Sequence, residues 1–276
     1  MTVRALVNGR PATAVSLEDR GLRYGDGLFE TIAFRERQAA LWSLHMRRLQ
    51  AGCRCLEIEP PDPDQLLDWA RRLTEPDGRA VVRVTVTRGD GGRGYFPPDP
   101  GPVGSRVVVQ SLDWPEGIDS ERREGLEAIW CSLRLSRQPA LAGIKHLARL
   151  EQVMAAAECA RAGVPEGFVL DTEGLVVEAI HSNVLIFVDD TLLTPELDVA
   201  GVRGVGLDAL VGQDGVSVTR ARITPEQVAR ATEWMVVNSV RGIRPVTRLG
   251  ESRRSPGPVC RFLQDVWNQV TAPDAT

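Results

Sequence analysis

Lysine is almost absent from this chain. Of the 33 basic residues among 276, all but one are arginine, and Lys145 is the single lysine. A GC-rich coding bias can replace most lysines by arginine, but it does not explain why one remains. Arginine keeps its proton in proteins, whereas a lysine amine can act as a base or form a Schiff base with a carbonyl group. Lys145 is therefore a candidate for a chemical role, with an incidental surface lysine as the alternative.

Patterns typical of metal sites and disulfide scaffolds are also missing. The chain has 5 cysteines, an odd number, and none of them form a C-x-x-C pair. These features argue against a disulfide framework and a four-cysteine zinc site. The 3 histidines show no H-E-x-x-H or comparable spacing, so we expect no metal site built by the protein.

Long apolar runs and an excess of positive charge are lacking as well. No run approaches the roughly 18 apolar residues that a membrane helix needs, and the N-terminus lacks the shape of a signal peptide. The net charge of −4 and the pI of about 5.6 argue against nucleic acid as the main partner. We therefore expect a cytoplasmic protein that binds neither membrane nor nucleic acid.

The pattern of hydrophobic residues predicts an α+β protein with two domains. Residues 1–112 form a small N-terminal domain that begins with a hairpin at Asn8-Gly9, and residues 113–140 form an irregular connector. Residues 141–276 are richer in strands, and we expect them to form a barrel-like sheet.

Helical periodicity predicts three helices that matter for the site. One begins near Trp42, and another begins at Asp62 or Asp64. The third runs through "IKHLARLEQVMAAAECARAG" and is closed by Gly163, which places Lys145 in its first turn. Its expected apolar stripe consists of Ile144, Leu147, Leu150, Met154 and Ala157.

A glycine motif at residues 89–94 looks like a dinucleotide-binding fingerprint. The spacing Gly89-x-Gly91-x-x-Gly94 follows a strand, but four prolines between residues 97 and 102 prevent the helix that this fingerprint requires. We interpret the segment as a flexible loop carrying Arg88, Arg93 and Tyr95. Two alternatives stay open: a loop suited to an anionic ligand and a plain surface loop.

If Lys145 forms a Schiff base, the usual protein-bound carbonyl is pyridoxal phosphate, and this cofactor needs further groups. Glu178, at the end of the predicted strand "LVVEAI", is a candidate carboxylate for the ring nitrogen. The glycines of "AGVRGVG" at 200–206 precede a predicted helix, and Arg48 projects from another; both suit a phosphate. Residues 238–240 form a polar turn. Taken singly, each group also fits an ordinary surface position.

Several tracts occur in the order found in fold-type IV pyridoxal-phosphate enzymes, and the sequence resembles that group along nearly its whole length. The tracts are "DRGLRYGDGLFET", "LHMRRL", "VTRGDGGRGY", "LAGIKHLARLEQV", "EGLVVEAIHSNVLIF", "LDVAGVRGV" and "NSVRGIRPV". Within the group, the tracts around Lys145 and Arg93 are most similar to those of aminodeoxychorismate lyases. The resemblance implies a small α/β N-terminal domain and a larger C-terminal pseudo-barrel domain.

The resemblance also implies cofactor roles. Lys145 would bind pyridoxal phosphate covalently, and Glu178 would pair with the pyridine nitrogen. Arg48 would bind the phosphate together with the backbone N–H groups of Val202 and Arg203.

Substrate roles follow from the same resemblance. Asn238 and Ser239 would face the substrate carboxylate, and Arg93 and Tyr95 would lie on a loop near the site, in such families often supplied across a homodimer interface. The small-molecule substrate would be 4-amino-4-deoxychorismate, converted to 4-aminobenzoate and pyruvate for folate biosynthesis.

Two departures from the lyase pattern bear on the activity. Residue 148 is alanine where the lyase tract has asparagine, and residues 30–31 are Glu-Thr where some lyases have Thr-Thr. An aminotransferase of the branched-chain or D-amino acid type on the same scaffold is the main alternative. A pyridoxal-phosphate binder without catalytic activity is the alternative from another class.

Overall fold

The computed structural model describes residues 4–98 and 104–272. The chain forms two compact units that are not sequential pieces. The first contains the residues up to Trp114 together with Ile144–Ala148, and the second contains Pro115–Gly143 and the residues from Arg149 on. Lys145 therefore belongs to the first unit although it follows a long stretch of the second.

A six-stranded antiparallel sheet, in the order β2-β1-β6-β5-β3-β4, forms the basis of the first unit. Its strands are β1 (Ala5–Val7), β2 (Arg10–Pro11), β3 (Gly27–Arg35), β4 (Gln38–Ala39), β5 (Arg79–Thr87) and β6 (Arg106–Leu112). The predicted Asn8-Gly9 hairpin is confirmed, with φ of 47° and 77° at the two turn residues. Positive φ at both positions is what a two-residue hairpin turn needs.

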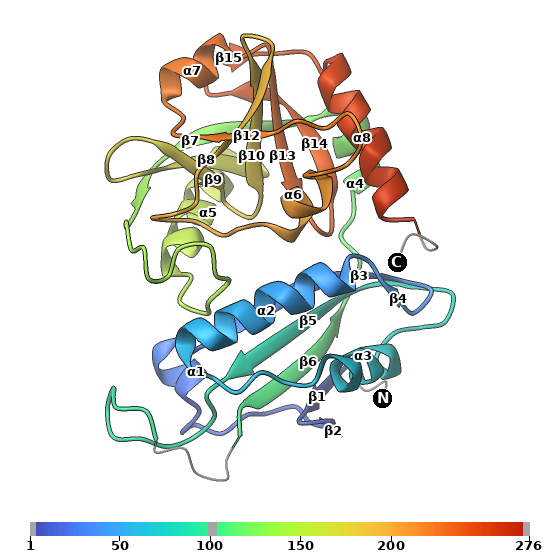
Figure 1. Cartoon of the computed structure of the whole chain (residues 1–276), viewed down its shortest axis with the longest axis vertical. Coiled ribbons are helices and arrows are strands. Elements are labelled where there is room, and N and C mark those ends of the chain that lie inside the picture. The colour runs from blue at the N-terminus through green and yellow to red at the C-terminus, as the bar shows by residue number, and fades with distance from the viewer. Residues whose placement is uncertain (1–3, 99–103, 273–276) are drawn as a thin grey trace. The chain divides into compact units, whose positions relative to one another are not determined.

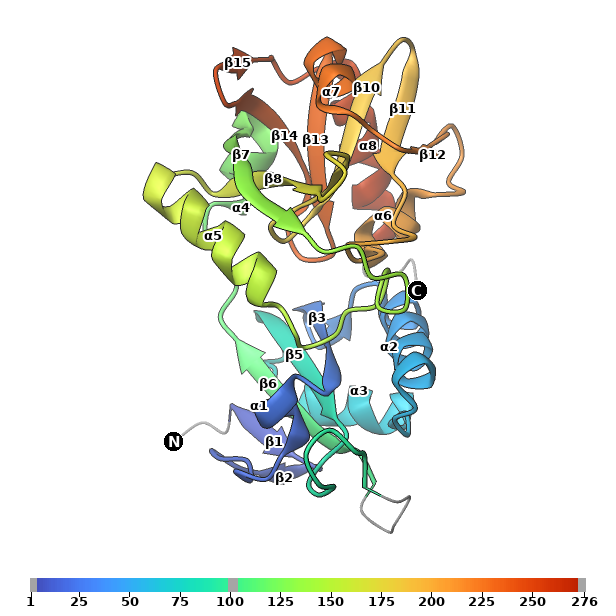
Figure 2. The same ribbon diagram turned by 90° about the vertical axis from the view of Figure 1, so that its left-hand side faces the viewer.

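Helices α2 (Trp42–Leu56) and α3 (Pro63–Arg72) cover one face of this sheet (Figures 1 and 2). The first unit also contains helix α1 (Arg20–Tyr24). Asp62 caps α3 by accepting hydrogen bonds from the amides of Asp64 and Gln65, so of the two predicted starts, Asp62 and Asp64, the first is confirmed. The shared core is formed by apolar side chains of β3, β5, β6, α2 and α3, among them Ile32, Val84, Val109, Leu49 and Leu66.

The second unit contains a nine-stranded mixed sheet that curls on itself. Its path is β12-β11-β10-β13-β14-β7-β8-β9, and β15 pairs with β14. Val176 in β9 bridges to Ile223, just beyond β12, so the two ends of the path meet. The expected barrel-like sheet is confirmed. The strands are β7 (Leu126–Leu135), β8 (Glu166–Asp171), β9 (Val176–Ala179), β10 (Asn183–Val188), β11 (Thr191–Pro195), β12 (Thr219–Ala221), β13 (Glu233–Asn238), β14 (Gly242–Leu249) and β15 (Ser252–Arg253).

Helices pack on different parts of the curled sheet. They are α4 (Ile118–Glu124), α5 (Leu150–Ala162), α6 (Val205–Leu210), α7 (Pro225–Arg230) and α8 (Pro258–Val270). Helix α5 packs against β7 and β8, and α6 and α8 pack against β13 and neighbouring strands (Figure 2). None of the helices in the described ranges has the length and apolar character needed to cross a bilayer.

The segment expected as an irregular connector is mostly regular. Residues 113–140 contain α4 and β7, and β7 lies inside the sheet between β14 and β8. In "CSLRLSR", arginines and serines alternate with apolar residues. In β7 the alternation is that of a strand with one covered face, since Cys131 and Leu135 are buried under α5.

Helix α5 begins later than predicted, and its expected apolar stripe is not buried. The helix starts at Leu150, which is 71% exposed, and Met154 is 54% exposed. The residues that pack on the sheet are instead Ala155 and Cys159. Small residues let the helix approach β7 closely, so the larger apolar side chains point away from the sheet.

Candidate active site

The backbone around Lys145 is extended rather than helical. The Phe29 amide donates to the Lys145 carbonyl at 3.0 Å, and the Leu147 amide donates to the Gly27 carbonyl at 2.9 Å. The segment 144–148 therefore runs along β3, and the prediction that Lys145 lies in a helix is wrong. The Lys145 amine lies 4.5 Å from the centre of the Phe29 ring, a distance at which an ammonium group is attracted to an aromatic face.

Arg48 lies on α2, where the helix faces a buried carboxylate. Its Nε donates to Glu30 Oε1 at 2.8 Å and its Nη2 donates to Glu30 Oε2 at 2.5 Å. His45, one turn earlier, binds the same carboxylate through Nδ1 at 2.6 Å. This two-point pairing fixes the plane of the guanidinium group, so Glu30 and His45 orient Arg48.

The charges in this cluster are strongly coupled. Burial would raise the pKa of Glu30, but the Arg48 charge and the hydrogen bonds from Arg48 and His45 lower it to about 2. Burial lowers the pKa of His45 despite the Glu30 carboxylate, and the nearby charges of Arg48 and Lys145 act in the same direction as burial. An ionised Glu30 can only accept, so His45 donates from Nδ1. The buried Nε2 atom of His45 has no partner.

Glu30 was the departure noted at position 30, and no role was predicted for it. The strand pattern held a signal, because Leu28, Glu30 and Ile32 share one face of β3 and the two neighbours are apolar. A carboxylate on a core-facing position requires a cationic or hydrogen-bonding partner. That partner is Arg48.

Because the pKa of Glu30 is lowered, acid should weaken the first unit. A carboxylate with a pKa of about 2 in the folded chain and about 4.5 in the unfolded chain stabilises the fold above pH 4.5. This contribution, about 3 kcal/mol, is lost as the pH falls from 4.5 toward 2. Urea unfolding of Glu30→Gln and of the parent protein should differ most at neutral pH and converge near pH 2. The control Glu36→Gln, at an exposed turn, should have nearly the same stability as the parent protein at every pH.

Glu178 ends a short buried strand in the second unit, as predicted. Its side chain is 5% exposed on β9. Gln152 Nε2 donates to Oε1 at 3.2 Å, and the Val202 amide donates to Oε2 at 2.8 Å. A buried carboxylate held by donors on both oxygens has a fixed orientation, which suits a group that must hold a charge on a bound ring.

The turn at residues 200–204 contains the two backbone N–H groups that were assigned to the cofactor's phosphate. The Val202 amide donates to Glu178, and the Arg203 amide donates to the Gly143 carbonyl at 3.0 Å. Both N–H groups assigned to phosphate therefore have acceptors within the chain. A phosphate would have to share or replace these acceptors, which ties its binding to the position of Glu178.

Asn238 and Ser239 lie in the turn that links β13 to β14. Asn238 Oδ1 accepts hydrogen bonds from the amides of Val240 at 3.1 Å and Arg241 at 2.8 Å, and its Nδ2 donates to Ser182 Oγ at 3.1 Å. The side chain of Asn238 thus supports the turn itself. Gly206 in α6 packs against the turn, since a Cβ there would lie 2.9 Å from the Asn238 carbonyl carbon.

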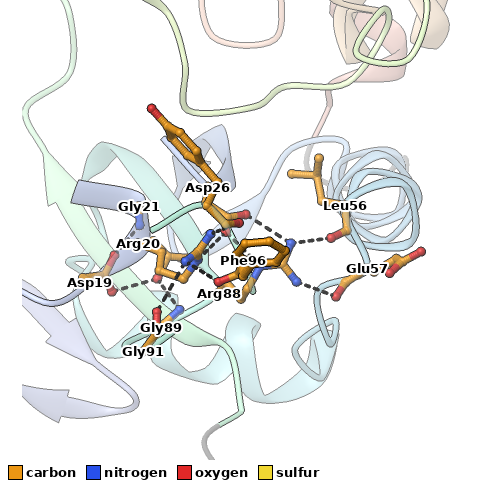
Figure 3. Close-up of polar contacts among 12 residues, drawn as sticks. Asp19, Arg20, Gly21, Asp26, Leu56, Glu57, Arg88, Gly89, Gly91 and Phe96 are labelled. Atoms are coloured by element: carbon orange, nitrogen blue, oxygen red, sulfur yellow. Dashed lines mark hydrogen bonds and ion pairs between the residues drawn. The ribbon is translucent and has the colours of Figure 1, made fainter. Parts of the chain in front are cut away.

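Of the three residues predicted to bind a ligand in the loop after β5, one is structural and two are exposed. Arg88 donates to Asp26 and to the carbonyls of Leu56 and Glu57, so it holds the loop's base (Figure 3). Arg93 and Tyr95 are exposed, Tyr95 to 86%. The dinucleotide motif is excluded as expected, because no helix follows in residues 89–98.

Each unit thus brings together part of the predicted set. The first holds Lys145 and Arg48 near His45, and the second holds Glu178 hydrogen-bonded to Val202. Within the first unit, an amine and an oriented guanidinium are the groups that could bind an aldehyde and a phosphate, and within the second unit an oriented carboxylate is a group that could pair with a ring nitrogen. Within residues 4–98 and 104–272, no cluster of three or more His, Cys, Asp or Glu residues could hold a metal ion.

The fold is that of the pyridoxal-phosphate enzymes of fold-type IV. The chain belongs to the amino-transferase class IV family, whose family model matches residues 27–249. The resemblance seen in the sequence tracts is therefore confirmed, and pyridoxal phosphate is the cofactor of this family.

Individual relatives agree with this assignment. An aminodeoxychorismate lyase from Vibrio harveyi is 35% identical over 244 residues, covering 87% of this chain and 89% of the relative. The crystal structure of 4-amino-4-deoxychorismate lyase from Pseudomonas aeruginosa is 40% identical, with a TM-score of 0.88, covering 96% of this chain and 98% of the other. The pyridoxal-phosphate-bound form of a hypothetical aminotransferase from Mycobacterium tuberculosis shares the fold, with 21% identity, a TM-score of 0.83 and coverage of 98% and 99%.

Proposed function

We propose that the protein is an aminodeoxychorismate lyase, which converts 4-amino-4-deoxychorismate to 4-aminobenzoate and pyruvate. The observation that carries the proposal is the 40% identity to a solved lyase over 96% of the chain, in a chain whose single lysine lies beside the Arg48 cluster. The product 4-aminobenzoate places the reaction in folate biosynthesis.

Lys145 performs the proton transfers. Pyridoxal phosphate, when bound, supplies an aldehyde that binds the substrate's amine and a ring that withdraws electrons from the adjacent carbon. Lys145 Nζ takes the proton from the carbon that carries the amine, and the bond between the neighbouring carbon and the enolpyruvyl oxygen breaks. The leaving enolate takes up a proton, which the Lys145 ammonium can return, and becomes pyruvate. The ring that remains is aromatic, which makes the step strongly favourable.

The other residues bind and orient. Arg48, held in plane by Glu30, binds the phosphate. Glu178, held by Gln152 and Val202, keeps the proton on the ring nitrogen. Ser239, in the turn that Asn238 supports, and the exposed pair Arg93 and Tyr95 bind the substrate's carboxylates.

Pyruvate release tests the proposed reaction. Purified protein loaded with pyridoxal phosphate should form pyruvate and 4-aminobenzoate in equal amounts from 4-amino-4-deoxychorismate, measured with a coupled dehydrogenase and by the fluorescence of 4-aminobenzoate. Glu178→Gln should lower kcat by about 10²-fold or more, because the ring nitrogen then loses its anionic partner. Protein that is fully loaded but forms no pyruvate would contradict the assignment.

The family name keeps an aminotransferase as the second candidate. In that reaction Lys145 would move a proton between two carbons and no oxygen would leave. Conversion of an amino acid and a keto acid without pyruvate release from aminodeoxychorismate would favour it. Saturable loading without either reaction would favour a binding protein. Homodimer formation and a cytoplasmic location stay predictions, and light scattering of the purified protein tests the first.

A further inference from the structure

The side chain of Arg20 lies inside the Gly91–Phe96 loop instead of in solvent, and the residue is 4% exposed. Its Nη1 donates to the carbonyls of Gly91, Gly94 and Phe96 at 3.4, 3.1 and 3.1 Å. Its Nη2 donates to the Tyr95 carbonyl at 3.1 Å. Figure 3 shows the guanidinium between the loop and Asp26. One side chain thus binds four carbonyls of a single short loop.

Asp26 anchors the other end of the guanidinium. Arg20 Nε and Arg88 Nε each donate to Asp26 Oδ2 at 2.8 Å (Figure 3). Burial would raise the pKa of Asp26, but hydrogen bonds from Arg88 and Arg20 outweigh it and keep the pKa below its usual value. Asp26 is therefore ionised at neutral pH, and Arg20 is held from both sides.

The same stretch of chain holds the lysine segment. Gly27, next to Asp26, accepts the Leu147 amide, and Phe29 donates to the Lys145 carbonyl. A Cβ at Gly25 would lie 3.1 Å from the Ala148 amide nitrogen. All of these contacts lie in the first unit. The loop, through Arg20 and Asp26, and the lysine segment are thus both fixed to residues 25–29.

We propose that Arg20 is a positioning residue for substrate binding: it holds the Gly91–Phe96 loop in the conformation that presents Arg93 and Tyr95 to a substrate carboxylate. The inference rests on the proposed function, which assigns those two residues to the substrate. The centres of the Tyr95 and Tyr24 rings are 5.4 Å apart, and Arg20 Cζ lies 4.9 Å from the centre of the Tyr24 ring. A loop that is already ordered loses less conformational entropy when the substrate binds.

Arginine is required at this position by geometry rather than by charge. Its planar group has five N–H donors in a fixed fork, whereas a lysine ammonium is a compact charge with three donors. Arg20→Lys would keep the ion pair with Asp26 but could not reach all of the loop carbonyls. The substitution therefore separates loss of the clamp from loss of the charge.

Two glycines of the loop provide a matched pair that leaves Arg20 in place. Gly92 and Gly94 have φ of +75° and +61°, so alanine is strained at both. A Cβ at residue 92 would lie 2.2 Å from the Phe96 carbonyl oxygen and 2.9 Å from Arg20 Nη1. A Cβ at residue 94 would meet nothing within 4 Å. Gly92→Ala therefore disrupts the clamp, and Gly94→Ala controls for backbone strain alone.

The experiment combines protease sensitivity with steady-state kinetics on protein loaded with pyridoxal phosphate. Trypsin cleavage after Arg93, followed by mass spectrometry, should be about tenfold faster in Arg20→Lys and Gly92→Ala than in the parent protein and Gly94→Ala. In the same two variants, KM for aminodeoxychorismate should rise about tenfold while kcat stays within about twofold. The visible absorbance of the bound cofactor should not change.

The possible outcomes separate this proposal from the proposed function. Equal cleavage rates in Gly92→Ala and Gly94→Ala would overturn the clamp. Faster cleavage with an unchanged KM would overturn the role of the loop's conformation in substrate binding. Absence of pyruvate from the parent protein would count against the lyase assignment and so against the substrate role, while the cleavage pattern would still decide whether Arg20 orders the loop.

Discussion

Lys145→Ala will abolish the reaction and the covalent attachment of pyridoxal phosphate together. The chain has no other lysine, so no second ε-amine can take over. We expect kcat/KM to fall on the order of 10⁴-fold or more, the scale seen when a residue that reacts covalently is removed. After reduction with borohydride, mass spectrometry of the parent protein should find the cofactor on the peptide containing residue 145, and the variant should carry none.

Lys145→Arg is the matched control for charge. It keeps a cation over the Phe29 ring, but a guanidinium neither deprotonates nor forms the covalent bond at neutral pH. Activity should be lost as in the alanine variant. Without cofactor, the urea midpoint of Lys145→Arg should stay close to that of the parent, because the backbone hydrogen bond from Phe29 and a cation near its ring both remain. Lys145→Ala should lose about 1 kcal/mol of stability with the cation–π contact. A borohydride-stable adduct on either variant would contradict the role of Lys145.

Local signals predicted the elements whose ends depend on neighbouring residues. The Asn8-Gly9 turn, the Asp62 cap of α3 and the Gly163 end of α5 are all determined within a few residues. The start of α5 was mispredicted because "IKHLARL" fits a helical period. Instead, the Leu147 amide donates to Gly27 and the Lys145 carbonyl accepts from Phe29, more than a hundred residues earlier in the chain. Periodicity carries no information about such partners.

The site shows the same division. Composition alone singled out Lys145, and the strand end at Glu178 was found from its pattern. Glu30, the partner of Arg48, was missed because α2 and β3 come together only in the tertiary structure. Arg88 was grouped with Arg93 by proximity in sequence, yet Arg88 binds the carbonyls of Leu56 and Glu57, whereas Arg93 is exposed. Residue type identified the candidate chemistry, but only the fold distinguishes a ligand residue from a structural one.

Arg244→Met will strongly destabilise the second unit. Arg244 and Glu166 are both 0% exposed, and their ion pair is 3.2 Å long. Arg244 also donates to Glu121 at 2.8 Å and to Ser182 at 3.0 Å. Removing one partner of a buried pair costs about 3–5 kcal/mol, because Glu166 then stays buried without its cationic partner and keeps a neutral hydrogen-bond donor, Ser182 Oγ at 3.0 Å. Urea unfolding followed by tryptophan fluorescence should show this loss, whereas Arg253→Met, at an exposed pair with Glu127, should change stability by less than about 1 kcal/mol.

A double variant shows whether the cost comes from the charge left behind. In Arg244→Met with Glu166→Gln, the buried carboxylate is gone, and the free energy of unfolding should recover by about half or more. Glu166 Oε1 and Arg244 Nε have no partners even in the parent protein, so the pair is incompletely satisfied and its removal as a unit is tolerated. KM should still rise in the double variant, because Ser182 loses the donor that orients it toward Asn238 and the turn of Ser239. Recovery of stability without recovery of KM would separate this network's support of the turn from its support of the fold, and a double variant no more stable than the single one would contradict the argument.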